Sequence, residues 1–263
     1  MGRRFRERRG ADLRAAQGLN RPLTLVRQAL NRVDGPWYLR GLFELAGSRR
    51  LSRPALHDLD AKLERWLDMD GGVFVEAGAY DGYKQSNTYY LERYGGWSGV
   101  LVEPIPALAR KCARHRRGAR VFNCALVPFD YSAPTVTMIF GEPTSAVKGV
   151  RSREQISRGL ARTGRRPYEV EVQARTLTAV LDEAEVSRLD LLSLDVEGYE
   201  IPVLRGLDFE RYAPRFILAE LLEFEAMLPE FRDALGARYE HVATLSHHDA
   251  LFRRADGGWA GPG

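Results

Sequence analysis

The residues that could do chemistry are concentrated first in the stretch VFVEAGAYDGYKQSNTYYLE, residues 73–92. An apolar run there leads through Glu76, Gly78 and Gly82 into a polar segment, residues 86–88, which predicts the start of a helix. In an open α/β sheet, a ligand binds where the first strand turns into its helix, beyond the carboxyl end of the strand. The stretch therefore predicts a loop that binds a nucleotide-like ligand.

Two common loop types fit this stretch poorly. A phosphate-binding P-loop has four residues between its glycines, whereas only three residues separate Gly78 from Gly82. A dinucleotide fingerprint needs a third glycine, and the carboxylates of Glu76 and Asp81 would repel a pyrophosphate. S-adenosylmethionine carries a sulfonium, an ammonium and one carboxylate, so acidic residues attract it, and free backbone N–H groups at residues 86–88 could receive its carboxylate. The loop therefore favours S-adenosylmethionine.

Another carboxylate lies at the end of the next apolar run. Glu103 follows GVLV directly, 21 residues after Gly82, and precedes Pro104, which stops a strand. A carboxylate at the tip of a second strand accepts both hydrogen bonds of a ribose diol. This geometry serves NAD and S-adenosylmethionine alike, so Glu103 indicates a nucleoside without choosing between them. The alternative is a surface ion pair.

Carboxylates also end two later apolar runs. The glycine in LDVEGYE permits a tight turn, so Asp195 and Glu197 are both expected to face the cofactor. Glu220 ends the run ILAEL and is expected beside Asp195, where the two side chains could hold Mg²⁺ through oxygen ligands. Alternatively, Glu197 and Glu200 cap a helix over residues 199–206, because the first turn of a helix favours acids.

Two histidines, His247 and His248, lie at the turn of a predicted C-terminal hairpin. An imidazole titrates near neutral pH, so His248 is a candidate general base. The alternative is an exposed histidine of the turn.

The elements that must position these residues are strands alternating with helices. The apolar runs GGVFVEAG, SGVLVEP, RVFNCALV, LDLLSLDVEG and RFILAEL are each followed by a helical stretch or a loop. Such alternation predicts an α/β fold with a mostly parallel sheet covered on both faces. The runs YEHVATLS and DALFRRA predict an antiparallel hairpin at the sheet edge. Residues 20–47 predict two short helices split by DGPW, and residues 54–68 predict another amphipathic helix.

Basic residues gather in two segments. The tail at residues 1–17 has five arginines between positions 3 and 9, and predicts either a solvated end or a contact with phosphate or a membrane surface. The insert at residues 143–168, between strands predicted at 135–140 and 168–176, has seven basic residues and one acid. It is expected to be either a substrate lid or a solvated loop. The domain prediction is a basic tail and helical cap over residues 1–69 and a catalytic domain over residues 70–263.

Composition limits the function classes. The 263 residues carry a net charge of +4, but four of the 39 basic residues are lysine, so 35 are arginine (39 − 4). Such a high ratio of arginine to lysine is first a codon signature of a GC-rich genome. The basic net charge is therefore discounted as evidence for nucleic-acid binding. No apolar run approaches the roughly 18–20 residues of a membrane span, and no secretory signal is evident. Cys112 and Cys124 are not at metal-ligand spacing. We therefore expect a cytoplasmic protein without a structural disulfide.

The order of several segments resembles the FkbM-type methyltransferase family. These are VEAGAYDGYKQSNTYYLE, GWSGVLVEPIPALARKC, VFNCALV, DLLSLDVEGYEIPVLRGLDF and RFILAEL, and the most specific part is the combination of SNTYYLE, LVEP and LDVEGYE-x-x-VLRG. The resemblance covers residues 70–255. It implies a class I (Rossmann-like) methyltransferase fold with a seven-stranded sheet, S-adenosylmethionine as cofactor, and O-methylation of a sugar or natural-product hydroxyl. It also implies adenine contacts at Asn123, Cys124 and Ala125. The expected cofactor contacts together are Glu76, Gly78, Tyr80, Asp81, Gly82, Ser86, Asn87, Glu103, Pro104, Asn123, Cys124, Ala125 and Asp195.

Transfer of a methyl group to a hydroxyl needs an aligned acceptor and a group that takes its proton. The expected catalytic residues are Asp195, Glu197 and His248. Base methylation of nucleic acid is disfavoured, because Asp-Val-Glu-Gly-Tyr stands where amino-group enzymes have Asn/Asp-Pro-Pro-aromatic, although ribose methylation stays open. An NAD-binding oxidoreductase and a non-catalytic nucleotide-binding protein are less favoured alternatives. We expect a small-molecule or oligosaccharide acceptor, and a homodimer contact through the N-terminal helices stays open.

Overall fold

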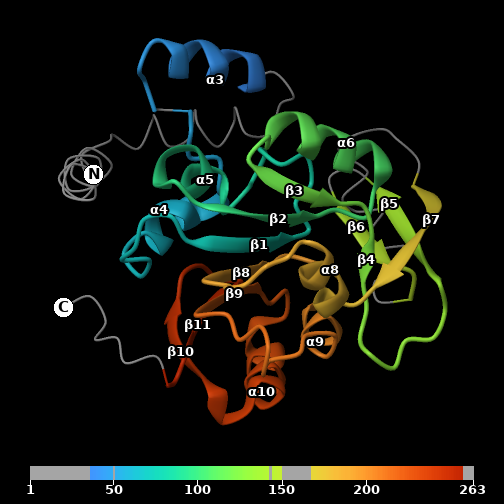
Figure 1. Cartoon of the computed structure of the whole chain (residues 1–263). Helices are drawn as coiled ribbons and strands as arrows, with labels where there is room; N and C mark the ends of the chain where they lie inside the picture. The colour runs from blue at the N-terminus through green and yellow to red at the C-terminus, as the bar shows by residue number, and fades with distance from the viewer. Residues whose placement is uncertain (1–35, 50, 142–143, 150–166, 257–263) are drawn as a thin grey trace.

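The apolar runs form one seven-stranded sheet, as the sequence predicts. The computed structural model describes residues 36–49, 51–141, 144–149 and 167–256 (Figure 1). The strands of this sheet are β1 (Val73–Ala77), β2 (Ser98–Val102), β3 (Ala119–Phe122), β8 (Leu191–Leu194), β9 (Phe216–Glu220), β10 (Tyr239–Thr244) and β11 (Asp249–Arg254). Their order is β10-β11-β9-β8-β1-β2-β3; the five strands from β9 to β3 are parallel, while β11 and β10 add an antiparallel hairpin. This order confirms the predicted mostly parallel α/β sheet with its C-terminal hairpin.

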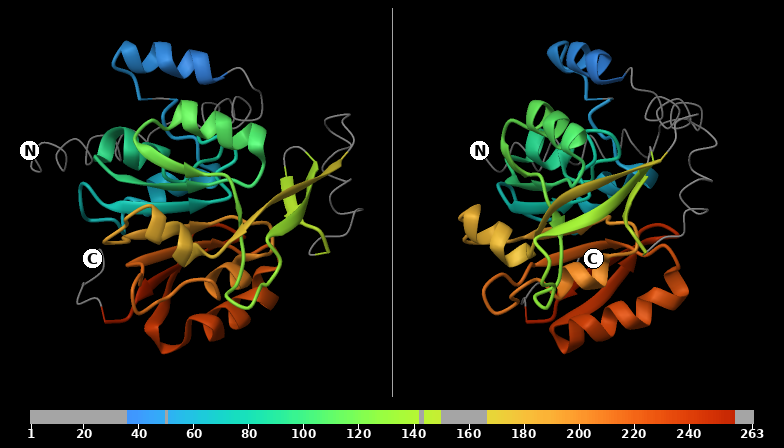
Figure 2. Two further views of the ribbon diagram at one scale, coloured as in Figure 1. Left: turned by 45° about the vertical axis from the view of Figure 1, so that its right-hand side comes forward. Right: turned by 90° about the vertical axis from the view of Figure 1, so that its right-hand side faces the viewer.

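Helices cover both faces of the sheet (Figure 2). They are α3 (Pro36–Leu45), α4 (Leu59–Leu63), α5 (Tyr89–Gly95), α6 (Pro106–His115), α8 (Leu177–Glu183), α9 (Glu200–Leu204) and α10 (Phe224–Leu235), with 3₁₀ turns η1 (Leu56–Asp58) and η2 (Gly236–Arg238). Successive strand residues point to opposite faces. Phe74 therefore packs in a core with α4, α5 and α6, and Val75 packs in a second core with α8, α9 and α10.

The carboxyl ends of the parallel strands meet at one edge of the sheet. Ala77 at the end of β1 pairs with Val102 of β2 on one side and with Leu194 of β8 on the other. Leu194 in turn pairs with Ala219 of β9. The residues that follow these positions are consequently brought together, which is the arrangement that the sequence predicts for the site.

The second, four-stranded sheet was not predicted as a sheet, although two of its strands form where strands are predicted, at residues 135–140 and 168–176. Its order is β4-β7-β5-β6, formed by β4 (Ala125–Leu126), β5 (Thr135–Gly141), β6 (Thr144–Val147) and β7 (Tyr168–Arg175). The single strand predicted for RVFNCALV is wrong: it divides into β3 and β4, which belong to different sheets. At the division, Asn123 Nδ2 donates to the carbonyl oxygens of Glu103 and Pro104, 2.9 and 2.7 Å away. Of the basic insert, residues 150–166 lie outside the described residues.

The N-terminal region also differs from its prediction. The helix expected over residues 54–68 is broken, because His57 and Asp58 have φ angles of 51° and 57°, and only η1 and α4 remain. The ring of His57 lies against that of His247, with centroids 4.8 Å apart, so a tertiary contact overrides the helical pattern. Of the two helices expected over residues 20–47, α3 forms, and residues 1–35 lie outside the described part. No helix in the described ranges is long and apolar enough to cross a membrane.

Candidate functional site

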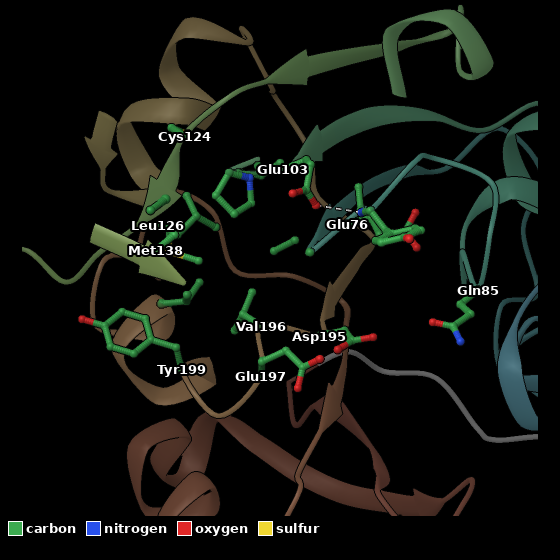
Figure 3. Close-up of a pocket in the computed structure, with 18 of the residues that line it drawn as sticks. Glu76, Gln85, Glu103, Cys124, Leu126, Met138, Asp195, Val196, Glu197 and Tyr199 are labelled. Atoms are coloured by element: carbon green, nitrogen blue, oxygen red, sulfur yellow. Dashed lines mark hydrogen bonds between the residues drawn. The ribbon is translucent and has the colours of Figure 1, made fainter. Parts of the chain in front are cut away.

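The loops after β1, β2 and β8 enclose one cavity at the carboxyl edge of the sheet (Figure 3). Glu103 lies on one side and Asp195 and Glu197 lie on the other, with Gln85 and Met138 toward opposite ends. The further lining residues are Glu76, Ala77, Gly78, Ala79, Tyr80, Lys84, Ser86, Asn87, Val102, Pro104, Cys124, Ala125, Leu126, Val147, Val196, Tyr199 and Val203. The structure thus brings together most of the expected cofactor contacts. Those outside the lining are Asp81, Gly82 and Asn123.

Two glycines let the loop after β1 pass close to its neighbours. Gly78 has a φ of 82°, and a Cβ there would lie 1.8 Å from the carbonyl oxygen of Asp195, so the loop meets the end of β8 only because this residue is glycine. A Cβ on Gly82 would lie 2.9 Å from Cγ of Arg116 and 3.0 Å from Cα of Cys112. Gly78 therefore shapes the cavity, whereas Gly82 shapes the packing of the loop on α6.

Glu76 anchors the start of α5. Its Oε1 accepts the N–H of Asn87 at 2.8 Å, and its Oε2 accepts the hydroxyls of Ser86 and Thr88 at 2.8 and 2.6 Å. The guanidinium of Arg116, whose side chain is 1% exposed, lies 3.4 Å from Oε2 and also donates to the hydroxyl oxygens of Ser86 and Thr88. This buried charge pair fixes the loop that carries the other cavity residues.

The expectation of free backbone N–H groups at residues 86–88 is wrong. The N–H of Ser86 donates to the carbonyl oxygen of Tyr83 at 3.1 Å, that of Asn87 donates to Glu76, and that of Thr88 lies 3.3 Å from Ser86 Oγ. The three acceptors are thus a carbonyl oxygen of the loop, the Glu76 carboxylate from β1 and the Ser86 hydroxyl. The sequence pattern of a helix start does not show that they are already occupied.

Asp81 shapes the same loop from outside the cavity. Its Oδ1 accepts the N–H groups of Tyr83 at 3.0 Å and Lys84 at 2.7 Å, which closes a turn of the Asx type. Its carbonyl oxygen lies 2.7 Å from Nδ1 of His115. A direct contact of Asp81 with the cofactor stays a prediction.

Glu103 stands where the sequence places it, directly after β2. Its Oε2 accepts the N–H of Tyr80 at 2.8 Å and its Oε1 accepts that of Ile105 at 2.9 Å. Burial raises the pKa of this carboxyl to about 8, with a further contribution from the negative charge of Asp195, although the two N–H donors oppose the shift. The carboxyl is thus buried and held by two backbone N–H groups at the edge of the cavity.

Asp195 and Glu220 lie side by side after β8 and at the end of β9. Burial raises the pKa of Asp195 well above its usual range, and the neighbouring Glu220 raises it further through its charge and a hydrogen bond. Burial likewise raises the pKa of Glu220 to about 7, against the hydrogen bond from Asp195. Simultaneous ionisation of both neighbouring carboxyl groups is costly, because two negative charges would then be buried together. The described residues contain no group of three or more His, Cys, Asp or Glu side chains that could hold a metal ion.

The turn after β8 directs Glu197 into the cavity. Glu197 and Gly198 have φ angles of 59° and 93°, so the chain reverses sharply there. Glu200, which is fully buried, holds this turn because its Oε1 accepts the N–H groups of Val196 and Gly198, each at 3.1 Å. Glu200 lies in the first turn of α9, whereas Glu197 precedes the helix and lines the cavity.

Comparison with known proteins agrees with this geometry. A family model for the methyltransferase FkbM domain matches residues 76–249. The chain belongs to the FkbM methyltransferase family. Methyltransferase 1 of Beauveria bassiana (strain ARSEF 2860) is 30% identical over 159 residues, covering 54% of this chain and 61% of that protein, so the chain spans less than two thirds of that relative.

The chain is also similar to two solved methyltransferase structures at low identity. Methyltransferase FkbM from Methylobacillus flagellatus KT gives a TM-score of 0.43 at 14% identity, covering 70% of this chain and 44% of that one. A TehB-like SAM-dependent methyltransferase from Corynebacterium glutamicum ATCC 13032 Kitasato gives a TM-score of 0.40 at 12% identity, covering 86% of this chain and 99% of that one. The sheet order of this FkbM-family chain is that of the predicted class I methyltransferase fold.

The residues of this FkbM-family cavity fit S-adenosylmethionine, the methyl donor that family membership implies. Oδ1 of Asn87 is buried and has no hydrogen-bond partner within the described residues, while Nδ2 of Asn87 lies 3.2 Å from Ser193 Oγ. A buried acceptor left unpaired is costly, and the ammonium of the cofactor would supply the missing donor. Glu103 offers acceptors for a ribose diol on the other side of the cavity.

Sequence reasoning missed most of the apolar end of the cavity. Cys124 and Ala125 line it as expected, but Asn123 instead holds the ends of β2 and β3 together. The lining there also includes Leu126, Met138, Val147, Tyr199 and Val203. The alternation in TVTMIF could have indicated a buried face that includes Met138, but not which cavity that face would meet.

His248 lies outside the cavity lining. Its carbonyl oxygen accepts the N–H of Leu221 at 2.7 Å, and its side chain lines a separate shallow depression together with His247. Glu223 and Phe224 form part of the same depression. The structure therefore separates the predicted imidazole base from the cavity that Asp195 and Glu197 line.

Proposed function

We propose that this chain is an O-methyltransferase that transfers the methyl group of S-adenosylmethionine to a hydroxyl of a sugar or natural-product acceptor. The observation that carries the proposal is a single cavity in which Glu103 faces Asp195 and Glu197 across the strand ends. The first carboxyl suits a ribose, and we assign the other two to the acceptor hydroxyl and its proton. Membership of the FkbM family supports methyl transfer, and the oxygen acceptor is our own step.

The residues of the cavity divide the work between binding and proton transfer. Bound S-adenosylmethionine supplies an activated methyl group and its own leaving group. Glu103 would bind the ribose, and Asn87 the ammonium. Asp195 and Glu197 would orient the acceptor hydroxyl and take its proton, because a general base has to lie within hydrogen-bond reach of that proton. We assign this role to Glu197 and Asp195 in preference to His248, which does not line the cavity.

The test combines binding with product analysis. Calorimetric titration with S-adenosylhomocysteine and with NAD distinguishes the two nucleoside cofactors. Incubation with methyl-labelled cofactor and a panel of hydroxylated acceptors should then give a methyl ether. Binding of NAD without S-adenosylhomocysteine would refute the cofactor assignment, and label found only on nitrogen or sulfur would refute the oxygen acceptor.

We further propose a cytoplasmic homodimer that forms through α3. The outer side of α3 exposes Leu39, Leu42, Phe43 and Leu45, of which Leu45 is 86% exposed. Apolar side chains grouped in this way on a helix are typical of an interface. Light scattering after gel filtration should show a dimer that Leu42→Glu converts to a monomer; a monomeric wild-type chain would refute the contact.

A further inference from the structure

The segment before the family match lies directly against the loop that lines the cofactor cavity. We call residues 36–49 and 51–55 the N-terminal clamp and residues 78–88 the cofactor loop. Ala55 forms a parallel bridge with Gln85, and the hydroxyl of Tyr83 donates to the carbonyl oxygen of Leu51. Figure 1 shows α3 lying above α5, the helix that follows the cofactor loop. The family match begins at residue 76, so these contacts come from outside the FkbM domain.

Glu44 of α3 joins the parts of this assembly. Its Oε1 accepts the hydroxyls of Ser52 and Tyr89 at 2.7 and 3.0 Å, and its Oε2 accepts Nε–H of Arg93 at 3.0 Å. The Ser52 hydroxyl is also 3.1 Å from that of Tyr94. The Glu44 side chain is only 6% exposed and both Ser52 and Tyr89 are buried, so its bonds to these two residues are largely shielded from water, while the bond to Arg93 lies at the surface. One carboxylate thus connects α3 and the extended part of the clamp to α5.

Arginines of the clamp stack on tyrosines of the loop and of α5. The guanidinium of Arg40 lies 5.1 Å from the ring centre of Tyr83 and 4.9 Å from that of Tyr89. Arg53 lies 3.5 Å from the ring centre of Tyr90. All three rings are buried, which strengthens a cation–π contact. The clamp therefore contacts the cofactor loop through hydrogen bonds and through cation–π contacts.

The clamp reaches the cavity through Gln85. This residue lines the cavity and has a φ of 64°, a conformation that a residue other than glycine keeps only when its surroundings impose it. The backbone bridge to Ala55 is such a constraint. We propose that the N-terminal clamp holds the cofactor loop in its binding conformation and so sets the cofactor affinity, with Glu44 as the positioning residue.

The physical basis is a population of loop conformations. The apparent dissociation constant equals the intrinsic one divided by the fraction of molecules whose loop is competent to bind. Loss of Glu44 leaves Ser52, Tyr89 and Arg93 without their shared acceptor, and so lowers that fraction. A fall to about one molecule in ten would weaken binding about tenfold. Saturating cofactor would restore the competent loop, so the maximal rate changes much less than the KM for the cofactor.

The experiment compares Glu44→Ala with two matched variants, using S-adenosylhomocysteine as the probe. Ala46→Ser alters an exposed residue that directly follows the same helix. Phe231→Leu loosens the distant core against Phe252 and controls for a lower melting temperature. We expect Glu44→Ala to raise the calorimetric dissociation constant at least about tenfold, and both controls to stay within about twofold of wild type.

Hydrogen exchange supplies a readout that a merely structural role would not move. In Glu44→Ala the amides of residues 83–94 should exchange faster than in wild type without ligand, and should recover protection with saturating S-adenosylhomocysteine. If Glu44→Ala fails to fold, Tyr83→Phe removes the hydroxyl that donates to Leu51 and should act in the same direction. Wild-type affinity in a folded variant overturns the proposal. The proposed function is tested separately, because its cofactor assignment fails when wild type itself does not bind the probe, whereas this proposal fails when the folded variant binds it as tightly as wild type.

Discussion

The buried pair of Arg116 and Glu76 gives the sharpest prediction for stability. Arg116 donates from Nε to Glu92 at 2.7 Å, from Nη1 to the carbonyl oxygen of Gly82 at 3.0 Å, and from Nη2 to Thr88 at 2.8 Å. The substitution Arg116→Met keeps an aliphatic stem against Gly82 but removes the charge and every donor. The carboxylate of Glu76, 6% exposed at its side chain, then stays buried without its cationic partner.

The size of the effect follows from the burial of both partners. Removing one member of a buried ion pair costs about 3–5 kcal/mol, because the remaining charge is neither hydrated nor paired. For a chain of this size each kcal/mol shifts the melting temperature by about 2–4 °C, so Arg116→Met should melt about 6–20 °C lower. Differential scanning calorimetry measures the shift. Arg117→Met is the matched control, because Arg117 is the exposed neighbour in the same RR dipeptide.

A double-mutant cycle tests whether the charge itself is responsible. Glu76→Gln removes the buried negative charge, so Arg116→Met should cost about 1–3 kcal/mol less in that background than in wild type. If Arg116→Met melts within about 2 °C of wild type, or costs the same in both backgrounds, the pair does not anchor the loop as we reason.

Three further predictions concern the cavity. The pKa of Glu103 is raised to about 8, so the carboxyl should lose its proton when it binds a ribose diol. In calorimetric titrations the affinity for S-adenosylhomocysteine should therefore rise about tenfold from pH 6 to 7 and level off above pH 8. Glu103→Gln should abolish this pH dependence. Glu197→Gln should lower kcat about 100-fold without changing S-adenosylhomocysteine affinity, whereas His248→Gln should leave kcat within about twofold; the opposite order in steady-state assays would return the base role to the histidine. Chelation by EDTA should leave kcat unchanged, because Asp195 and Glu220 are engaged with each other; a loss of activity that added Mg²⁺ restores would reinstate the predicted metal site.

The raised pKa of Glu103 makes the folded chain less stable as the pH rises. Glu103 has a folded-state pKa near 8, above its ordinary value, so its contribution to the free energy of unfolding is fully present at acid pH. That contribution is lost as pH rises through 8, because the unfolded chain ionises more readily than the folded one. Cofactor binding opposes the loss, since the bound diol favours the carboxylate.

The strand ends could be predicted from sequence because each rests on a local pattern. Glu103 follows an apolar run and precedes a proline, and Asp195 follows LLSL, so the rule that parallel strands end at one edge was enough to bring them together. The second sheet could not be predicted in this way. β4 has only two residues, too few to show a pattern, and it pairs with β7 almost fifty positions later. The alternation that predicts a strand at residues 168–176 does not identify that partner.

Arg116 shows a different limit of sequence reasoning. It stands beside Arg117 at the end of α6, and the two residues are locally indistinguishable, yet one is 1% exposed and the other is exposed. What distinguishes them is Glu76, 40 positions earlier in the chain. The same distant carboxylate accepts the N–H of Asn87. The local sequence does not show this bond, so it predicts an open helix start that the structure does not have.

The origin of the attraction for a cationic cofactor changes accordingly. The sequence suggested the acidic loop, but Glu76 is neutralised by Arg116 and Asp81 is satisfied by two backbone N–H groups. The acidic groups that remain toward the cavity stand at the strand tips, at Glu103, Asp195 and Glu197. Burial raises the pKa of the first two, and the charge of Asp195 adds to the shift at Glu103 while that of Glu220 adds to the shift at Asp195. A sulfonium and an ammonium entering between them would lower those pKa values again, so the carboxyl groups would lose protons to the solvent as the cation binds and would become negative only in its presence.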